Sequence, residues 1–276
     1  MIFFPAVTQV ATGIFFYKER FFMHTYSSLK NDLLQSGLQP SDTVLIHSSM
    51  KSIGNVEGGA DTVLDVLMDF FGKEGLLVFP TLTYNIYGQE EKNFSPEKTP
   101  SVVGILTEMF RKRPGVVRSL HPTHSVAAFG KDAEEFCAGH EKFSTPCARR
   151  SPWGKLYDRK AKILFIGTKS IGCSTFFHGV EEFLPVPGMF EKESYDLKLE
   201  HPDGSIEIIP SLRHNGHHNK YYALTMPLLQ EKGALSDAKF GDAACFLLDA
   251  AKSADILLAL LKENPFFFTE EFQEKK

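Results

Sequence analysis

The chain is poor in cysteine, and its cysteines do not form a recognisable motif. Only four of its 276 residues are cysteines, and they lie far apart with no C-x-x-C pair: Cys137, Cys147, Cys173 and Cys245. This pattern argues against a clustered zinc site and against a disulfide framework. We therefore expect no metal and a reducing, cytoplasmic setting.

Several catalytic motifs are also missing. The sequence contains no G-x-x-x-x-G-K-[ST] loop for a nucleoside triphosphate and no H-E-x-x-H zinc helix. Ser48 and Lys51 match S-x-x-K, the nucleophile motif of penicillin-recognising enzymes, but the K-T-G and S-D-N parts are absent. An acyl-serine hydrolase is therefore less favoured than a transferase.

Positive charge is not in excess. With 30 Lys and Arg against 34 Asp and Glu, the net charge is −4, which gives no basic surface for nucleic acid. A local acidic patch could instead meet a cationic substrate.

A long apolar run is missing as well, since a membrane-spanning helix needs about 20 apolar residues. Residues 1–22 are apolar and aromatic, but Pro5 interrupts them and no basic residue precedes them, so neither a spanning helix nor a secretory signal fits. We expect no integral membrane association, a functional start at Met23, residues 1–22 as an extension, and a single domain over 23–276. A weak membrane-surface anchor is the alternative for residues 1–22.

Apolar runs bounded by glycine and proline predict buried strands alternating with helices. We expect strands at residues 43–46, 75–82, 126–129 and 162–166, and helices at 27–35, 60–71, 101–113 and near 156. Residues 195–200 and 205–209 flank an HPDG turn and predict a hairpin. Residues 221–230 and 243–261 are expected to close the chain as helices. The alternation indicates an α/β protein.

The segment from Lys162 to Glu182 carries the strongest candidate for chemistry. A buried strand ends at Gly167, a polar loop follows, and a helix beginning near Ser174 would place His178 and Glu181 on one face. A carboxylate beside an imidazole fixes its tautomer and favours its protonated form, as a general base requires. The alternative is a packed core histidine.

A second candidate is the hydroxyl-rich loop between the first strand and the helix at 60–71. Helix amino termini and backbone N–H groups attract phosphates, and a lysine adds a charged contact. This loop could bind an anionic or thioester ligand through residues from His47 onward: His47, Ser48, Ser49, Met50, Lys51 and Ser52.

Histidines cluster at two further places, which leaves a metal-dependent hydrolase open as a rival function. The clusters contain His121 and His124, with a proline between them, and then three more: His214, His217 and His218. Polar loops that bind nothing are at least as good an explanation for them.

Taken together, the motifs and their order resemble the aminoglycoside 3-N-acetyltransferase family. The resemblance runs from about Met23 to the final helices and rests on I-H-S-S at 46–49, V-E-G-G-A at 56–60, P-T at 80–81, T-P-S at 99–101, R-S-x-H-P at 118–122, S-P at 151–152 and H-x-x-E at 178–181. It implies an α/β three-layer sandwich with a central mixed sheet, here with a small antiparallel hairpin region, and acetyl-CoA as the donor.

The resemblance also implies roles for particular residues. His178 is the expected base and Glu181 its orienting carboxylate. The expected acetyl-CoA contacts are the loop from His47 to Ser52 and the loop from 119 to 125, with Ser119, His121, His124 and Ser125. For the acceptor we expect Glu57, Tyr84, Glu182 and His214.

The acceptor is expected to be a small-molecule amine, either an aminoglycoside or a related amino sugar. Acetylation of a nucleotide-linked amino sugar in surface-glycan synthesis is the alternative, because Phe176 and Phe177 could narrow the pocket. From a different class, a non-catalytic CoA-binding protein on the same scaffold stays open. A homodimer is compatible with the sequence.

Overall fold

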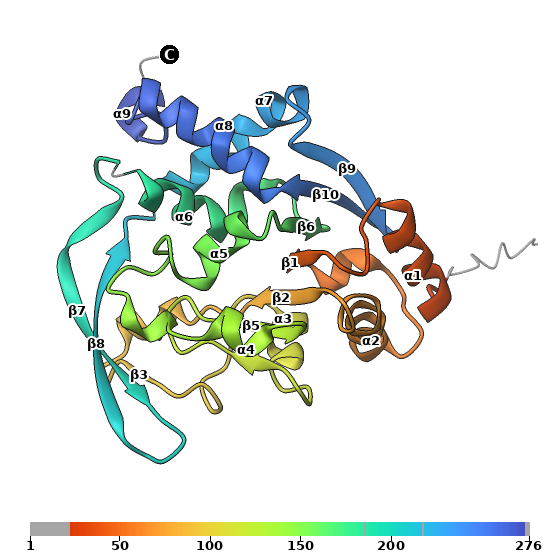
Figure 1. Ribbon diagram of the computed structural model, residues 1–276, viewed down its shortest axis with the longest axis horizontal. Helices are drawn as coiled ribbons and strands as arrows, with labels where there is room; N and C mark the ends of the chain where they lie inside the picture. The colour runs from red at the N-terminus through yellow and green to blue at the C-terminus, as the bar shows by residue number, and fades with distance from the viewer. Residues whose placement is uncertain (1–22, 185, 217, 274–276) are drawn as a thin grey trace, which may run out of the picture.

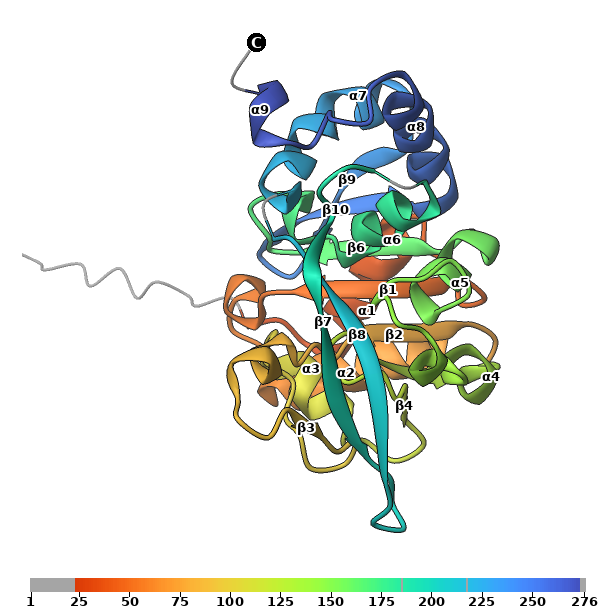
Figure 2. The same ribbon diagram turned by 90° about the vertical axis from the view of Figure 1, so that its left-hand side faces the viewer.

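A seven-stranded mixed sheet forms the centre of the protein, as the computed structural model shows for residues 23–184, 186–216 and 218–273. The strand order is β4-β5-β2-β1-β6-β10-β9. Figure 1 labels all of these strands except β4, which is labelled in Figure 2. The strands are Thr43–Ser48 (β1), Leu76–Pro80 (β2), Val117–Arg118 (β4), Val126–Gly130 (β5), Lys162–Ile166 (β6), Leu235–Phe240 (β9) and Ala243–Asp249 (β10).

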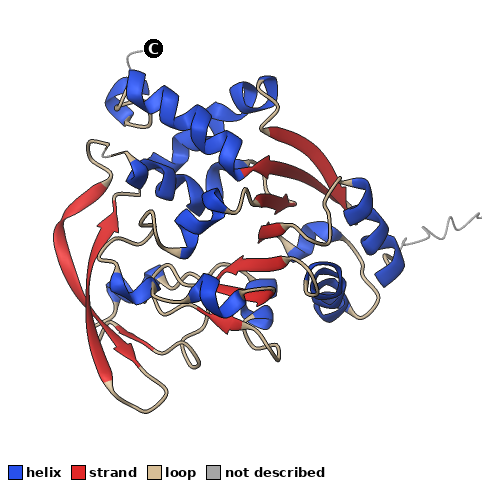
Figure 3. Cartoon of the chain, viewed as in Figure 1, coloured by secondary structure: helices blue, strands red, loops and turns tan. Residues whose placement is uncertain are grey.

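The helices lie on both faces of this sheet (Figure 3). They are Tyr26–Gln35 (α1), Gly59–Phe71 (α2), Ile105–Phe110 (α3), Ala133–Cys137 (α4), Pro152–Asp158 (α5), Thr175–Phe183 (α6), Met226–Glu231 (α7), Ala250–Glu263 (α8) and Glu270–Gln273 (α9). Core residues of α1, α2 and α3 pack on one face, and those of α4, α5, α6, α7 and α8 pack on the other. The predicted three-layer α/β fold is confirmed.

Strand β1 shows why the central strands read as continuous apolar runs. It pairs in parallel with β2 on one side and with β6 on the other. Val44 and Ile46 face the α1–α3 layer, whereas Leu45 faces the opposite layer, and all three are fully buried. A strand covered on both faces needs apolar side chains at every position.

A second, smaller sheet stands beside the first. Strands Phe190–Glu200 (β7) and Ile206–His214 (β8) form a long antiparallel hairpin, and Asn93–Phe94 (β3) pairs in parallel with β7. Figure 2 shows the hairpin on the side that faces the viewer, where it runs across the direction of the central strands. The predicted hairpin is confirmed but is longer than expected, and its last residue, His214, returns to the main body.

Three helix predictions are wrong in their bounds. Residues 243–249 form β10, which pairs antiparallel with both β6 and β9, so sheet pairing overrides the helical pattern expected for 243–261. Helix α3 begins only after Gly104, whose φ of +125° is not helical. Residues 218–225 form a 3₁₀ helix before α7.

Among the helices of the described residues, none combines the length and the apolar character needed to cross a membrane. The expectation for residues 1–22 lies outside the described residues.

Candidate active site

The candidate site is a cavity at the carboxyl end of β6, where α6 begins. Its volume is about 390 Å³, and its wall consists of Leu82, Tyr84, Tyr87, Val103, His124, Gly172, Cys173, Ser174, Thr175, His178, Arg213, His214, Gly216 and Asn219. A second cavity of about 220 Å³ adjoins it at the end of β1 and contains His47, Ser48 and Thr168. The two share wall residues Leu82, Val103, Cys173 and Thr175. The carboxyl ends of parallel strands are where open α/β sheets bind ligands.

His178 and Glu181 lie on one face of α6, as their spacing predicts. The Nδ1 atom of His178 is 3.6 Å from Oε2 of Glu181, a distance longer than a direct hydrogen bond. The helix begins where the sequence predicts, with Ser174 at the N-cap position, although the Ser174 side chain makes no capping hydrogen bond.

The hydroxyl of Tyr222 joins the two side chains. It lies 2.8 Å from Nδ1 of His178 and donates to Oε2 of Glu181. Burial and the charge of Glu181 raise the pKa of this fully buried phenol well above its usual value, so it keeps its proton. Because that single proton goes to the carboxylate, the hydroxyl oxygen accepts from Nδ1–H of His178. This geometry assigns the lone pair of the imidazole to Nε2.

Glu181 is a buried carboxylate that remains charged. Burial raises its pKa, but the imidazoles of His178 and His218 together lower it to about 2. Nδ1 of His218 is 2.6 Å from Oε1 of Glu181, and the glutamate is only 1% exposed. Hydrogen bonds from the Tyr222 hydroxyl and from His218 thus stabilise the charge inside the protein.

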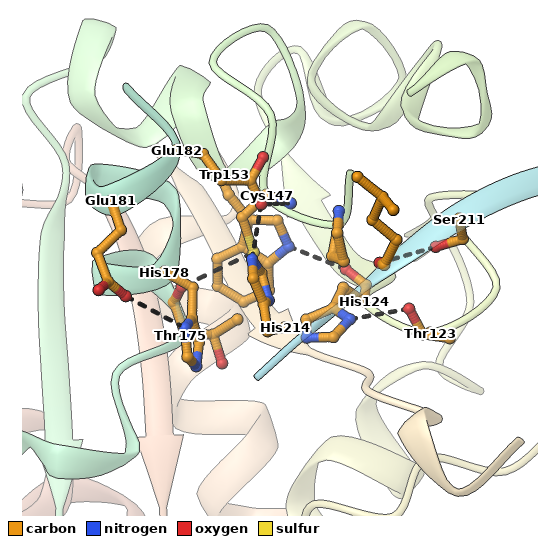
Figure 4. A network of polar contacts seen from close by, with 12 residues as sticks. Thr123, His124, Cys147, Trp153, Thr175, His178, Glu181, Glu182, Ser211 and His214 are labelled. Atoms are coloured by element: carbon orange, nitrogen blue, oxygen red, sulfur yellow. Dashed lines mark hydrogen bonds and ion pairs between the residues drawn. The ribbon is translucent and has the colours of Figure 1, made fainter. Parts of the chain in front are cut away.

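His214 reaches the cavity from β8 and stacks on His178. Their ring centroids are 4.4 Å apart with an interplanar angle of 13°, and Phe190 stacks against His214 with centroids 5.1 Å apart. Figure 4 shows His178, His214 and His124 beside one another. Burial and the neighbouring His178 hold the pKa of His214 well below its usual value. His214 is therefore a neutral wall of the cavity.

Glu182 supports His214 and does not line the cavity. Its Oε1 lies 2.8 Å from Nε2 of His214 and accepts a hydrogen bond of 2.8 Å from the backbone N–H of Cys147. Burial raises the pKa of Glu182 to about 7. The predicted contact of Glu182 with the substrate is not what this geometry provides.

The loop at the end of β1 only partly faces the cavities. His47 and Ser48 line the smaller cavity, and the ring of His47 stacks on Phe165 at 5.1 Å. Ser52 donates to Ser49 and to the carbonyl of Gly167, so these hydroxyls hold the loop on β6. Lys51 is exposed, and Met50 packs against the core on the α1–α3 side.

The loop at 119–125 is mainly structural. Ser119, His121 and Ser125 are at most 1% exposed, so they do not reach the surface of either cavity. Ser119 contacts Nδ1 of His140 at 2.9 Å, and Ser125 donates to the carbonyl of Thr81. Of the four residues predicted here, His124 alone lines the larger cavity.

The two remaining acceptor candidates lie apart. Tyr84 stands on the wall of the larger cavity and is 49% exposed. Glu57 is exposed, and its backbone N–H donates to the carbonyl of His24 at the entrance to α2, away from both cavity walls. The structure therefore separates Glu57 from the other predicted residues.

One group within the described part of the chain has ligand atoms close enough for a metal ion. His124, Cys147 and His214 place one atom each within 4.8 Å of the others, a donor set that suits a thiophilic ion such as Zn²⁺. Burial raises the pKa of the Cys147 thiol well above its usual value, which favours the protonated form. His121 and His218 contact other partners, and His217 lies outside the described residues. The five histidines proposed for a hydrolase therefore do not form a single ligand set, and the expectation of no metal stays a prediction.

The buried imidazoles make stability depend on pH. Burial lowers the pKa of His47 to about 4 and of His140 to about 3, and it lowers three others well below their usual value: His121, His124 and His214. A lowered folded-state pKa means that the unfolded chain binds more protons below about pH 6.5. The stabilisation is complete above that pH and is lost as the pH falls toward 4.

We therefore expect the free energy of unfolding to fall between pH 7.5 and pH 5.5, by about 1 kcal/mol each from His47 and His140 and by a further loss of the same sign from the other three imidazoles. Glu182, whose pKa is raised to about 7, acts in the opposite direction but is a single group. Urea denaturation at pH 7.5, 6.5 and 5.5 measures the change. A free energy of unfolding that stays constant over this range would contradict the prediction.

Comparison with known proteins adds independent information. Residues 45–262 match the family described as aminoglycoside 3-N-acetyltransferase. The SPbeta prophage-derived aminoglycoside N(3')-acetyltransferase-like protein YokD of Bacillus subtilis is 33% identical over 186 residues, which are 59% of this chain and 67% of the relative. Aminoglycoside N(3)-acetyltransferase VII of Streptomyces paromomycinus is 30% identical over 59% of this chain and 62% of its own length. These alignments thus span about two thirds of the relatives.

Solved structures share the fold over more of the chain. The crystal structure of YokD from Bacillus subtilis matches with a TM-score of 0.78 and 27% identity, covering 88% of this chain and 95% of that one. The apoenzyme of AAC(3)-IVa matches with a TM-score of 0.78 and 24% identity over 91% of this chain and 93% of that one. The sheet order and the two helical layers therefore recur in known proteins.

Proposed function

Because the chain belongs to the aminoglycoside 3-N-acetyltransferase family of acyltransferases, we propose that it transfers the acetyl group of acetyl-CoA to a primary amine. The acceptor is an aminoglycoside, acetylated at the 3-N position, or a related amino sugar. His178 acts as the general base, and Glu181 and Tyr222 hold it in position.

The connection from Glu181 through Tyr222 to His178 is the observation that carries this proposal. A base for acetyl transfer must present a lone pair to the reacting amine, and the Tyr222 hydroxyl at 2.8 Å from Nδ1 leaves that lone pair on Nε2. His178 lines the larger cavity, where an acceptor amine can approach it. The buried charge of Glu181 favours the imidazolium that forms when Nε2 takes a proton.

The proposed reaction proceeds by direct attack. The neutral amine attacks the thioester carbonyl carbon, the new C–N bond forms, and Nε2 of His178 takes the proton that the nitrogen loses. The C–S bond then breaks, and the CoA sulfur leaves and receives the proton from His178. No acyl-enzyme is needed, and general-base help of this kind contributes about 10²- to 10⁴-fold in rate.

The smaller cavity is the proposed place for the donor's reactive end. It adjoins the larger cavity through shared wall residues and lies at the end of β1, beside Ser48. A structure of similar fold, AAC-IIIb with CoASH, has a TM-score of 0.76 and 24% identity, and covers 87% of this chain and 97% of that one. It supports a CoA thioester as the donor.

Release of CoA from acetyl-CoA, measured with a panel of aminoglycosides and amino sugars, tests the proposed function. Mass spectrometry of the acceptor should show a gain of one acetyl group. Absence of turnover with every amine, despite binding of acetyl-CoA, would overturn the proposal and favour a non-catalytic CoA-binding protein.

Tyr222→Phe provides a narrower test of the mechanism. Removal of the hydroxyl leaves His178 and Glu181 joined only by the 3.6 Å contact, so Nδ1 loses its acceptor. A hydrogen bond to a charged group contributes about 1.5–3 kcal/mol, so kcat is expected to fall about 10- to 100-fold. KM for acetyl-CoA should change little. Tyr157→Phe, which removes a hydroxyl bonded to Asp255 on the surface, is the matched control. An unchanged kcat in Tyr222→Phe would rule out this role.

The cytoplasmic location and the homodimer stay predictions. Size-exclusion chromatography with light scattering measures the oligomeric state directly.

A further inference from the structure

We propose, resting on the function proposed above, that the acceptor is an amino sugar of low positive charge that carries an anionic group, a phosphate or a carboxylate, bound by Arg213. The acceptor is then not a polycation. The inference follows from the charges on the wall of the larger cavity.

The first observation is that no carboxylate lies on the described wall of this cavity. Its one permanently charged side chain among the described residues is Arg213, at the end of β8. His124 and His214 also line it, and an imidazole carries no permanent charge.

The nearest glutamates on α6 do not supply the missing negative charge to a ligand. The side chains of Glu181 and Glu182 are only 2% and 4% exposed. The oxygens of Glu181 bind Tyr222 and His218, and Oε1 of Glu182 accepts hydrogen bonds inside the protein. Neither can form a direct ion pair with an ammonium group in the cavity.

Glu57 does not change this balance, since it is exposed beside the entrance to α2 and lines neither of the two cavities. The sequence suggested Glu57 and Glu182 as contacts of the acceptor. The structure places Glu57 on a different part of the surface and Glu182 behind His214. The geometry therefore does not support either glutamate as a contact of the acceptor.

The position of Arg213 suits it to bind an anion. Its guanidinium carbon lies 5.0 Å from the ring centroid of Tyr87, another wall residue, and the side chain is 46% exposed. One nitrogen contacts Glu191 at 3.4 Å, a long contact with a carboxylate that is itself 33% exposed. A planar guanidinium with five N–H donors can bind this carboxylate and still donate to a phosphate or carboxylate of the ligand.

The same cavity is unfavourable for an aminoglycoside with several ammonium groups. Each ammonium that loses water in the cavity needs an acceptor or a counter-charge, and one near Arg213 is repelled. A singly aminated sugar exposes one nitrogen to His178, and its ring can lie against Tyr84 and Tyr87. Sites of this kind combine aromatic walls with a few polar groups that fix orientation.

Steady-state rates with four acceptors test the inference: glucosamine, glucosamine 6-phosphate, muramic acid as the carboxylate counterpart, and kanamycin as the polycation. The wild-type protein is expected to have its highest kcat/KM with one of the two anionic sugars, and the comparison between them identifies the anion. In Arg213→Gln, the KM for that sugar should rise about 10- to 100-fold relative to the KM for glucosamine. Arg213→Glu should shift the preference toward kanamycin. Arg150→Gln, a change of an exposed arginine outside the cavity wall, should leave the ratios unchanged.

Calorimetry measures the binding of the same acceptors in the presence of CoA. This measurement distinguishes a failure of the charge preference proposed here from a failure of the acetyltransferase function. Turnover that favours kanamycin in the wild type and is insensitive to Arg213 would overturn this inference and leave the acetyltransferase function intact. Binding of an anionic sugar that depends on Arg213, without turnover of any amine, would overturn the proposed function and support the charge preference of the cavity.

Discussion

Replacement of His178 by glutamine is expected to lower kcat by about 10²- to 10⁴-fold, the contribution of a well-placed general base. Glutamine keeps a polar group of similar reach but has no nitrogen lone pair that can accept a proton at neutral pH. The acceptor would then lose its proton to solvent after attack. Binding of acetyl-CoA, measured by calorimetry, should change little, because the proposed donor cavity does not include His178.

His201→Gln is the control for this experiment. His201 also pairs with a glutamate, Glu207, at 2.9 Å, but it lies at the exposed turn of the hairpin between β7 and β8. Its replacement should leave kcat unchanged. If His178→Gln retained the rate of the wild type, another group would have to accept the proton, and the assignment of the base would be wrong.

Glu181→Gln is expected to have the second large effect, on stability and on rate. The glutamate is 1% exposed, and its carboxylate oxygens bind the Tyr222 hydroxyl and Nδ1 of His218. A hydrogen bond to a charged group contributes about 1.5–3 kcal/mol, and the amide cannot replace both of these bonds at full strength. We expect the free energy of unfolding at pH 7 to fall by several kcal/mol in urea denaturation.

The rate should fall as well, because the amide reverses the hydrogen bonds through Tyr222. An amide nitrogen that donates to the Tyr222 hydroxyl makes that hydroxyl donate to Nδ1 of His178, which moves the imidazole proton to Nε2. The lone pair then points away from the amine. The corresponding aspartate-to-asparagine change in a Ser-His-Asp triad costs about 10⁴-fold through the wrong tautomer. We expect kcat to fall by at least 10²-fold.

Glu207→Gln is the matched control for stability. It removes a glutamate from a similar His–Glu pair, but the Glu207 side chain is 48% exposed. Exposed pairs contribute about 0–1 kcal/mol, so its free energy of unfolding should stay close to that of the wild type. Equal losses in the two variants would show that burial of Glu181 is not the source of its effect.

The pH dependence of the Glu181 effect follows from its lowered pKa. Because its pKa in the folded state is about 2, below the ordinary value of 4.5, its stabilisation is complete above about pH 4.5 and is lost as the pH falls toward 2. The stability difference between the wild type and Glu181→Gln should therefore persist at all pH values at which the buried imidazoles still allow folding.

Much of the fold could be predicted from the sequence because the signals are local. Strand β6 reads as a short apolar run from Ile163 to Ile166, preceded by Lys162 and closed by Gly167, and these apolar residues are buried as expected. The prediction failed at β10, whose continuous apolar run fits a buried helix as well as a buried strand until β6 and β9 are available as partners. Pairing between distant segments leaves no mark within either segment.

The site also has a part that follows from the sequence and a part that does not. His178 and Glu181 are three residues apart on one helix, so their shared face follows from the helical repeat alone. Tyr222, His214 and His218 are not near them in the sequence, and none of the three forms a motif with α6. A tyrosine that follows a histidine cluster gave no signal that its hydroxyl would sit between a base and a carboxylate.

By itself, the sequence determined the α/β class, the buried central strands, the hairpin and the helical face that carries His178 and Glu181, because these depend on side-chain periodicity and on contacts within one element. Only the tertiary structure decided which atom of His178 keeps its lone pair, which glutamates are hidden and which charge faces the ligand. Those properties depend on burial and on hydrogen bonds between segments far apart in the chain, and chain folding alone brings these segments together.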